Sequence, residues 1–190
     1  MTLLLLRTII KKAGYLPYNM NAKKPSESTT TQTEIVLPND TNNLNNLMGG
    51  KLLHWMDIVA AVCAQRHCER TCVTAAVNNV SFGHPIPRAS IVTLEANISR
   101  SFSSSMEIII DVWTEDPQSG TKTKCNEAIY TFVAVDAMGK PVNVPEVCPE
   151  SDLENSRYDA ALRRRQLSLI LAGKMKADQA TELKALFNKP

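Results

Sequence analysis

One stretch of the sequence, residues 49–67, constrains the fold more than any other. It begins with Gly49 and Gly50 and continues without glycine or proline through residues that favour helices, so it predicts one long helix. Apolar side chains occur all round the helical wheel, and Asp57 is the only residue in its interior that is charged at neutral pH. A helix with this pattern is buried on most sides, so the rest of the chain has to wrap it.

Four β-rich stretches follow the helix and can supply that wrapping. They cover residues 71–82, 90–102, 105–114 and 122–135. Apolar and polar residues alternate from Ile91 to Ser99, which gives this strand one apolar face, and short turns at 101–104 and 116–120 favour antiparallel neighbours. A further short strand is predicted at 34–37. The sequence therefore predicts an α+β fold in which an antiparallel sheet wraps one central helix.

The remainder of the chain suggests three segments. Residues 21–33 are polar and show no apolar period, so we expect residues 1–32 to form a flexible leader. An upstream start codon, with Met20 as the native first residue, is the simpler explanation of the amino end, and an organelle presequence is the alternative. Residues 33–147 form the predicted domain, and 148–190 form a helical C-terminal extension. Its helices are predicted at 151–172 and 177–187.

Charge and cysteine content narrow the class of protein. The formal net charge is +2, but five basic residues without an acid lie within the first 24 residues, so the remainder is mildly acidic. A nucleic-acid-binding domain would present a basic face, so we expect no nucleic-acid partner. The five cysteines are an odd number and form no Cys-x-x-Cys pair, which indicates free thiols and no metal site. We expect a cytoplasmic protein that uses no cofactor. The apolar run at the amino end is far shorter than the ~20 residues of a membrane span.

A carboxylate inside an apolar helix needs a partner or a task, because burial disfavours its charged form. Asp57 is either a structural residue bonded to a neighbouring hydroxyl or amide, or a catalytic group. The amino end of the same helix can polarise a carbonyl through its free N–H groups, and the loop at 39–46 supplies several asparagine amides. A helix amino end, a carboxylate and an amide are the groups needed to hydrolyse an ester-like bond.

The spacing of these groups predicts a site shared by two chains. Gly50 and Asp57 are seven residues apart, which separates them by about 10 Å along the helix axis. One bound carbonyl cannot contact both within a single chain. Two copies of the helix lying antiparallel across a dimer interface would bring the amino end of one helix next to Asp57 of the other.

Several short motifs occur in an order that resembles a known family. They are Pro38-Asn39-Asp40-Thr41-Asn42, Met48-Gly49-Gly50, Met56-Asp57, Arg66-His67, Val73-Thr74-Ala75 and Phe82-x-x-Pro85-Ile86. The likeness continues through residues 104–108 and 128–136. Over about residues 33–147 the chain resembles the hotdog-fold acyl-CoA thioesterases, both the bacterial short-chain type and the mammalian brain-type hydrolases.

The resemblance implies a hotdog fold, with a long central helix wrapped by the sheet, and a homodimer that assembles further into a trimer of dimers, a hexamer. It implies hydrolysis of acyl-CoA to a free fatty acid and CoA, as part of fatty acid metabolism. The family's catalytic acid falls on Asp57. Its catalytic asparagine falls on Asn42 of the opposite subunit, with Asn46 as the competing assignment.

The same resemblance places substrate contacts at a glycine pair and a serine pair. Gly49 and Gly50 open the helix, and the Gly50 N–H would polarise the thioester carbonyl. Asp57 would either activate water or attack the thioester to give a transient anhydride. Ser104 and Ser105 lie where the family contacts pantetheine, although serines are also ordinary turn residues.

Two other functions remain open from the sequence. His54 lies three residues before Asp57 on the same helical face, so the two could form a base dyad. A hotdog acyl-CoA hydratase or dehydratase would use such a histidine. A protein of this fold could also bind acyl-CoA without turning it over.

Overall fold

Five strands form one antiparallel sheet in the computed structural model, which describes residues 20–187. The first 19 residues of the predicted leader lie outside the described residues. The strand order is β1-β3-β4-β5-β2, so β4 is central and β1 and β2 are the two edges. The strands are β1 (Thr30–Ile35), β2 (Thr71–Phe82), β3 (Ile91–Ser101), β4 (Ser105–Glu115) and β5 (Lys122–Val135).

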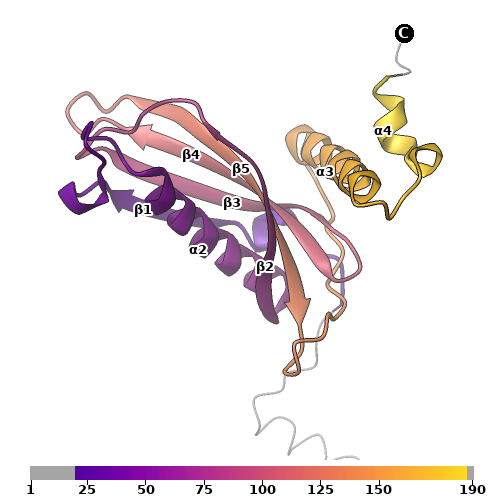
Figure 1. Cartoon of the computed structure of the whole chain (residues 1–190). Helices are drawn as coiled ribbons and strands as arrows, with labels where there is room; N and C mark the ends of the chain where they lie inside the picture. Colours follow the sequence, from indigo (N-terminus) through magenta and orange to yellow (C-terminus); the bar gives the residue numbers. More distant parts are fainter. Residues whose placement is uncertain (1–19, 188–190) are drawn as a thin grey trace, which may run out of the picture.

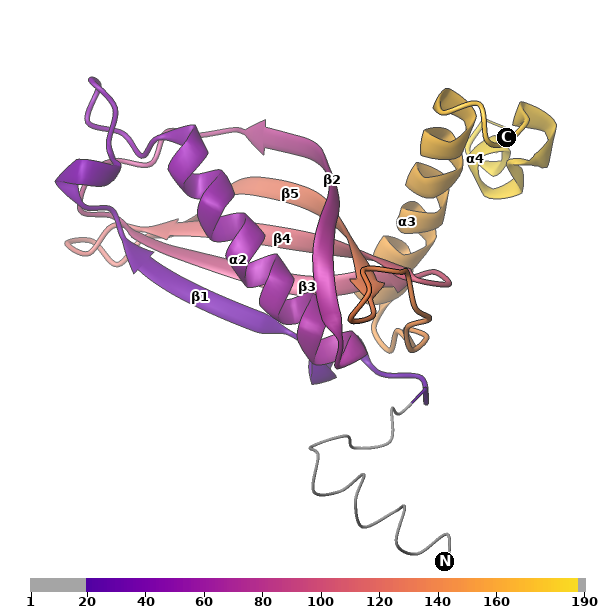
Figure 2. The same cartoon turned by 60° about the horizontal axis from the view of Figure 1, so that its bottom comes forward.

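The long helix α2 (Gly49–Cys68) lies along the concave face of the sheet (Figure 1, Figure 2). Its inward stripe forms the hydrophobic core with the facing side chains of β3, β4 and β5. Met56 and Ala60 are fully buried, while Ile58 and Val62 are 41% and 37% exposed. The expectation that this helix is buried on most sides is therefore wrong for the single chain, because the sheet covers one stripe and leaves the other to solvent.

The four predicted strands after the helix agree with β2 to β5 to within one residue at each end. β3, β4 and β5 pair antiparallel through the two short turns, as predicted. The sequence alone does not show that β2 pairs with β5, the last strand, rather than with β3. This pairing makes β2 an edge strand and places it beside α2 (Figure 2).

The amino-terminal strand differs from the prediction. β1 begins at Thr30, four residues before the predicted strand, and a 3-10 turn, η1 (Pro25–Glu27), precedes it. Lys23 is only 8% exposed and pairs with Glu69 at the end of α2. The prediction of a flexible leader is therefore wrong for residues 23–32. These residues gave no apolar period because β1 is an edge strand rich in threonine.

The helix α3 (Asp152–Leu171) agrees with the prediction at 151–172. The Ser151 hydroxyl accepts the N–H of Glu154 at 3.3 Å, and the Glu154 carboxylate accepts the N–H of Ser151 at 2.9 Å. This reciprocal pair is a capping box and sets where the helix begins.

The last predicted helix, at 177–187, is wrong in its extent. The chain forms a 3-10 turn, η3 (Ala177–Gln179), and a short helix, α4 (Thr181–Ala185). The break is at Ala180, and Gln166 of α3 accepts the N–H of Leu183, in the first turn of α4, at 2.8 Å in place of a bond within a continuous helix. None of the helices in residues 20–187 is long and apolar enough to cross a membrane.

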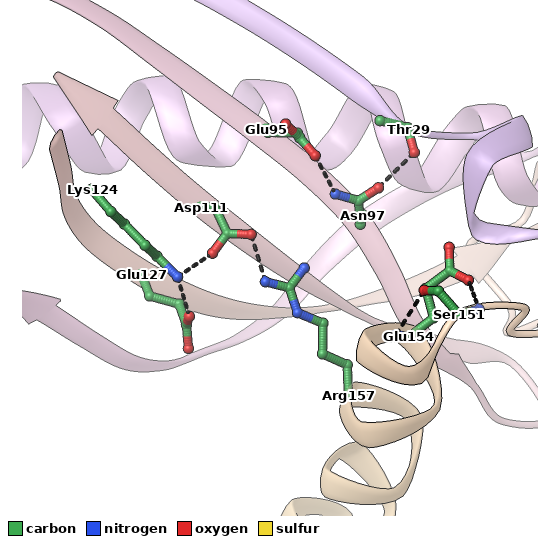
Figure 3. A network of polar contacts seen from close by, with 9 residues as sticks. All are labelled: Thr29, Glu95, Asn97, Asp111, Lys124, Glu127, Ser151, Glu154 and Arg157. Atoms are coloured by element: carbon green, nitrogen blue, oxygen red, sulfur yellow. Dashed lines mark hydrogen bonds and ion pairs between the residues drawn. The ribbon is translucent and has the colours of Figure 1, made fainter. Parts of the chain in front are cut away.

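The sequence leaves open where α3 packs, and the structure places it on the convex face of the sheet, opposite α2 (Figure 1). Arg157 donates to Asp111 of β4 at 2.6 Å, and Lys124 of β5 binds the same carboxylate (Figure 3). Arg164 makes two hydrogen bonds to Glu107, also on β4. Charge-assisted hydrogen bonds to two buried carboxylates therefore attach the C-terminal extension to the domain.

Candidate active site

Asp57 lies half-buried in the middle of α2, at the border between the buried and the exposed stripe. Its Oδ1 accepts a hydrogen bond from the hydroxyl of Thr74, on β2, at 2.8 Å. This bond orients the carboxylate and leaves the second oxygen for water or a substrate. A carboxylate with a purely structural role would make the same contact, but the contact uses only one of the two carboxylate oxygens of Asp57.

The phenol of Tyr130, on β5, lies near the same carboxylate. Its hydroxyl donates to the carbonyl of Leu53, about one turn before Asp57, at 3.3 Å. Burial, together with the negative charge of Asp57, raises the pKa of Tyr130 to about 12. Tyr130 is therefore neutral at physiological pH and acts as a hydrogen-bond donor rather than as a base.

The loop at residues 41–46, here called the asparagine loop, folds back on the first turn of α2. It follows a 3-10 turn, η2 (Pro38–Asp40), and the buried Asp40 carboxylate pairs with Lys51 of the helix at 3.0 Å. The side-chain oxygen of Asn42 accepts the N–H groups of Leu44 and Asn46, at 2.9 and 3.2 Å. Because the loop uses this oxygen, Asn42 presents its NH2 group as the donor for a ligand.

The amino end of α2 has no cap from its own N-cap side chain. Met48 is the N-cap residue, and no acidic residue lies in the first turn. A β-carbon on Gly49 would lie 3.3 Å from the ring of Phe82, so glycine permits this close approach. A β-carbon on Gly50 would meet nothing within 4 Å, so packing within the described chain does not account for glycine there.

A cleft of about 330 Å³ lies between the asparagine loop, the first turn of α2 and residues 82–86. Asn42, Asn46 and Gly49 line it, so the structure brings the predicted loop and helix-start residues together. Asp57 is not part of its lining, as the distance along the helix requires. Within one chain, the amide and the helix amino end are thus assembled without the carboxylate.

Ser104 and Ser105 lie at the turn between β3 and β4, away from this cleft. Ser105 pairs with Val133 of β5, whereas Phe82, at the cleft, pairs with Asn126 of the same strand. These partners are seven residues apart, about 23 Å along the strand. Contact of the two serines with pantetheine stays a prediction.

Other candidates from the sequence are not joined to the carboxylate. His54 is exposed, and the structure gives no hydrogen bond between it and Asp57 within the described residues. His67 is buried, and its Nε2 bonds the carbonyl of Pro145 at 3.1 Å. The five cysteines are free thiols, and residues 20–187 contain no group of three or more His, Cys, Asp or Glu side chains that could hold a metal ion.

Known proteins resemble this chain over most of its length. The profile of the thioesterase superfamily matches residues 44–121, which include α2 and β2. The Bacillus subtilis protein YkhA, described as an uncharacterized acyl-CoA thioester hydrolase, is 41% identical over 138 residues, which cover 73% of this chain and 80% of that protein. The chain belongs to the thioesterase superfamily. Its similarity to YkhA places it among the acyl-CoA thioester hydrolases of that superfamily.

Solved structures of acyl-CoA thioesterases share the fold of this superfamily member. A hexameric acyl-CoA thioesterase without ligand has a TM-score of 0.78 at 34% identity, over 80% of this chain and 97% of that one. The acyl-CoA hydrolase of Staphylococcus aureus, in complex with butyryl coenzyme A, coenzyme A and coenzyme A disulfide, has a TM-score of 0.74 at 34% identity, over 86% and 99%. Alanine variants of that hydrolase, which replace an Asp, a Thr and an Asn, are also similar. The predicted hotdog fold and thioesterase family are confirmed.

Sequence reasoning missed two residues of this candidate site. Thr74 belongs to a motif of the resemblance, but only the position of β2 beside α2 shows that its hydroxyl reaches Asp57. Asn126 lines the cleft from the face of β5 that also carries Ala128 and Tyr130. The one signal for it in the sequence is a polar residue on the core face of a strand.

Proposed function

We propose that the chain hydrolyses acyl-CoA to a free fatty acid and CoA at a site shared by two copies, with Asp57 as the catalytic carboxylate. The observation that carries the proposal is the position of Asp57. Its carboxylate is half-buried, is oriented by Thr74, and lies apart from the cleft at the start of its own helix.

The Staphylococcus aureus variants support the residue assignment. In that hydrolase the replaced Asn precedes the replaced Asp by 15 residues, and the replaced Thr follows it by 17. Asn42, Asp57 and Thr74 have the same two spacings. Asn46 does not, so we assign the catalytic amide to Asn42.

Hydrolysis needs an attacking group, a polarised carbonyl and a leaving group. Asp57 either takes a proton from a water that attacks the thioester carbon, or attacks that carbon itself to give an anhydride that water then opens. The Gly50 N–H, at the positive end of α2, stabilises the developing oxyanion, and the Asn42 NH2 group orients the water or the carbonyl. The carbon–sulfur bond breaks, and CoA leaves as a thiolate that takes up a proton.

The exposed stripe of α2 and the edge strand β2 form the surface for the second copy. An edge strand has unpaired backbone groups, and exposed apolar side chains favour association. The apolar side chains on this surface, which are 37% to 48% exposed, are Ile58, Val62, Val73 and Val77. Asp57 and Thr74 adjoin them, so a two-fold axis here would carry the partner's Asn42 and helix start toward Asp57. We assign the assembly as a homodimer and, since a similar acyl-CoA thioesterase is hexameric, we propose that three such dimers assemble into a hexamer.

The pantetheine arm of CoA extends from the thioester toward solvent. We retain Ser104 and Ser105 as its contacts because of the resemblance to the family. Both lie at the β3–β4 turn, and Ser105 is 6% exposed in the single chain.

A free-thiol release assay over acyl-CoAs of varied chain length tests the activity. Asp57→Ala is expected to lower kcat/KM by roughly 10²–10⁴-fold, because it removes the base or nucleophile. Asn42→Ala is expected to lower it by roughly 10²-fold. Asp159→Ala, on the exposed side of α3, and Asn43→Ala, in the asparagine loop, are the matched controls. Folded wild-type protein that releases no thiol at any chain length would contradict the proposal.

Mixed subunits test whether the site is shared. When Asp57→Ala and Asn42→Ala chains exchange freely, about half of the dimers are mixed, and each mixed dimer has one intact site. We therefore expect recovery of about a quarter of the wild-type activity. Absence of recovery, with exchange verified by mass spectrometry, would place both residues in one chain's site.

A further inference from the structure

The cleft at the start of α2 contains a polar group that the proposed hydrolysis does not use. The amide of Asn126, on β5, forms part of the cleft wall. Asn126 is 4% exposed, and neither its Oδ1 nor its Nδ2 has a hydrogen-bond partner within residues 20–187. Buried amides are nearly always paired, so this one requires an explanation.

The residues next to Asn126 do not share its lack of hydrogen-bond partners. Along the same face of β5, Ala128 is apolar, and the hydroxyl of Tyr130 donates to the Leu53 carbonyl. Phe82, the partner of Asn126 on β2, supplies only a ring to the cleft. The amide is therefore a buried group of the cleft wall whose hydrogen-bonding capacity the described chain leaves unused.

The remaining lining of the cleft indicates what kind of molecule it accepts. Leu47, Leu52, Phe82 and Ile86 make most of it apolar. Its polar lining residues besides Asn126 are Asn42, Asn46 and His84. Its volume of about 330 Å³ is at the low end for ligand pockets. An apolar pocket of this size beside the thioester suits a short acyl chain.

A free amide adds a further requirement on that chain. Asn126 has both a donor and an acceptor to satisfy, and a hydroxyl group can accept from the first and donate to the second. We propose that Asn126 is a specificity-determining residue that hydrogen-bonds a hydroxyl group on the acyl chain, so that the preferred substrates are short hydroxyacyl-CoA esters. This inference rests on the proposed function and names its substrate class.

The physical basis is discrimination by an unpaired polar group. A plain acyl chain would leave the Asn126 amide buried without a partner, whereas a hydroxyacyl chain would pair it. Sites that hydrogen-bond a substrate hydroxyl reject the analogue lacking it far more strongly than an apolar pocket rejects a change in size. The amide would thus act on substrate choice without touching the reacting atoms.

Free-thiol release from three four-carbon esters tests the inference: butyryl-CoA, 3-hydroxybutyryl-CoA and 4-hydroxybutyryl-CoA. We expect the wild-type protein to show a kcat/KM at least about tenfold higher for one of the hydroxy esters than for butyryl-CoA. Asn126→Leu should lower that ratio at least about tenfold. Its melting temperature should not fall, since an apolar group of similar size replaces an unpaired amide.

Asn97→Leu is the matched control, because it removes a half-buried amide from the convex face, where Asn97 is paired with Thr29 (Figure 3). It should leave the substrate ratio unchanged. If Asn126→Leu does not fold, Asn126→Ala gives the same readout.

Two results would overturn the inference while leaving the proposed function in place. They are turnover without preference for either hydroxy ester, and an Asn126 variant that lowers kcat/KM for all three esters equally. No turnover of any ester would instead overturn the proposed function, and the inference with it.

Discussion

Two helices of 20 residues each pack on opposite faces of one sheet, and different interactions hold them. β4 contacts both: Ile108 and Ile110 face α2 in the apolar core, whereas Glu107 and Asp111 face the arginines of α3. Apolar burial is insensitive to moderate changes of pH and salt, while ion pairs depend on both. The helix that bears the proposed catalytic carboxylate thus packs on the face that is insensitive to pH and salt. The attachment of the C-terminal extension depends on both.

The largest expected effect is a difference between the two helices in how much each contributes to the free energy of unfolding. Met56→Ala, in the core stripe of α2, should lower the free energy of unfolding by about 2–5 kcal/mol, because it removes a fully buried side chain and leaves a cavity. Leu167→Ala, on α3, should change it by less than about 0.5 kcal/mol, since Leu167 is 45% exposed. Urea titration measures both, and comparable losses would contradict the assignment of the core to the concave face.

Removing one charge on the convex face should release α3 while α2 stays folded. Glu107→Gln weakens two hydrogen bonds to Arg164, and we expect a loss of about 1–2 kcal/mol that is confined to α3 in hydrogen exchange. Glu127→Gln is the control, because Glu127 is 41% exposed and its pair with Lys124 contributes little. Faster exchange in α2 as well would show that the two helices do not open separately.

On the concave side, the corresponding test concerns activity rather than attachment. Thr74→Val removes the hydroxyl that orients Asp57, so kcat/KM in thiol release should fall about tenfold, a change of about 1.4 kcal/mol in transition-state stabilisation. Thr31→Val, on the other edge strand, should leave activity unchanged. Unchanged kcat/KM in Thr74→Val would mean that the bond holds Asp57 only as a structural residue.

The two faces also differ in how far the sequence predicts them. The helix α2 and strands β2 to β5 follow from local patterns, namely helix formers after a glycine pair and alternation between turns. The position of α3 does not, because Ile108, Ile109 and Ile110 form a continuous apolar run that hides which residues face outward. In the site, Asp57 and the glycine pair are conspicuous in sequence, whereas Thr74 and Asn126 become relevant only once β2 and β5 pair beside the helix.

The smallest effect concerns pH on the convex face. Burial opposes the charge on Asp111, but hydrogen bonds and charges from Lys124 and Arg157 outweigh it, so the pKa of Asp111 lies below its usual range. A carboxyl with a depressed folded-state pKa contributes stability above its unfolded-state pKa, about 3.9, and loses that contribution as pH falls through the folded-state value. Below about pH 4, limited proteolysis should therefore cut α3 before α2, and Asp111→Asn should weaken this pH dependence. If both helices become susceptible together over that range, charge pairing does not distinguish the two faces.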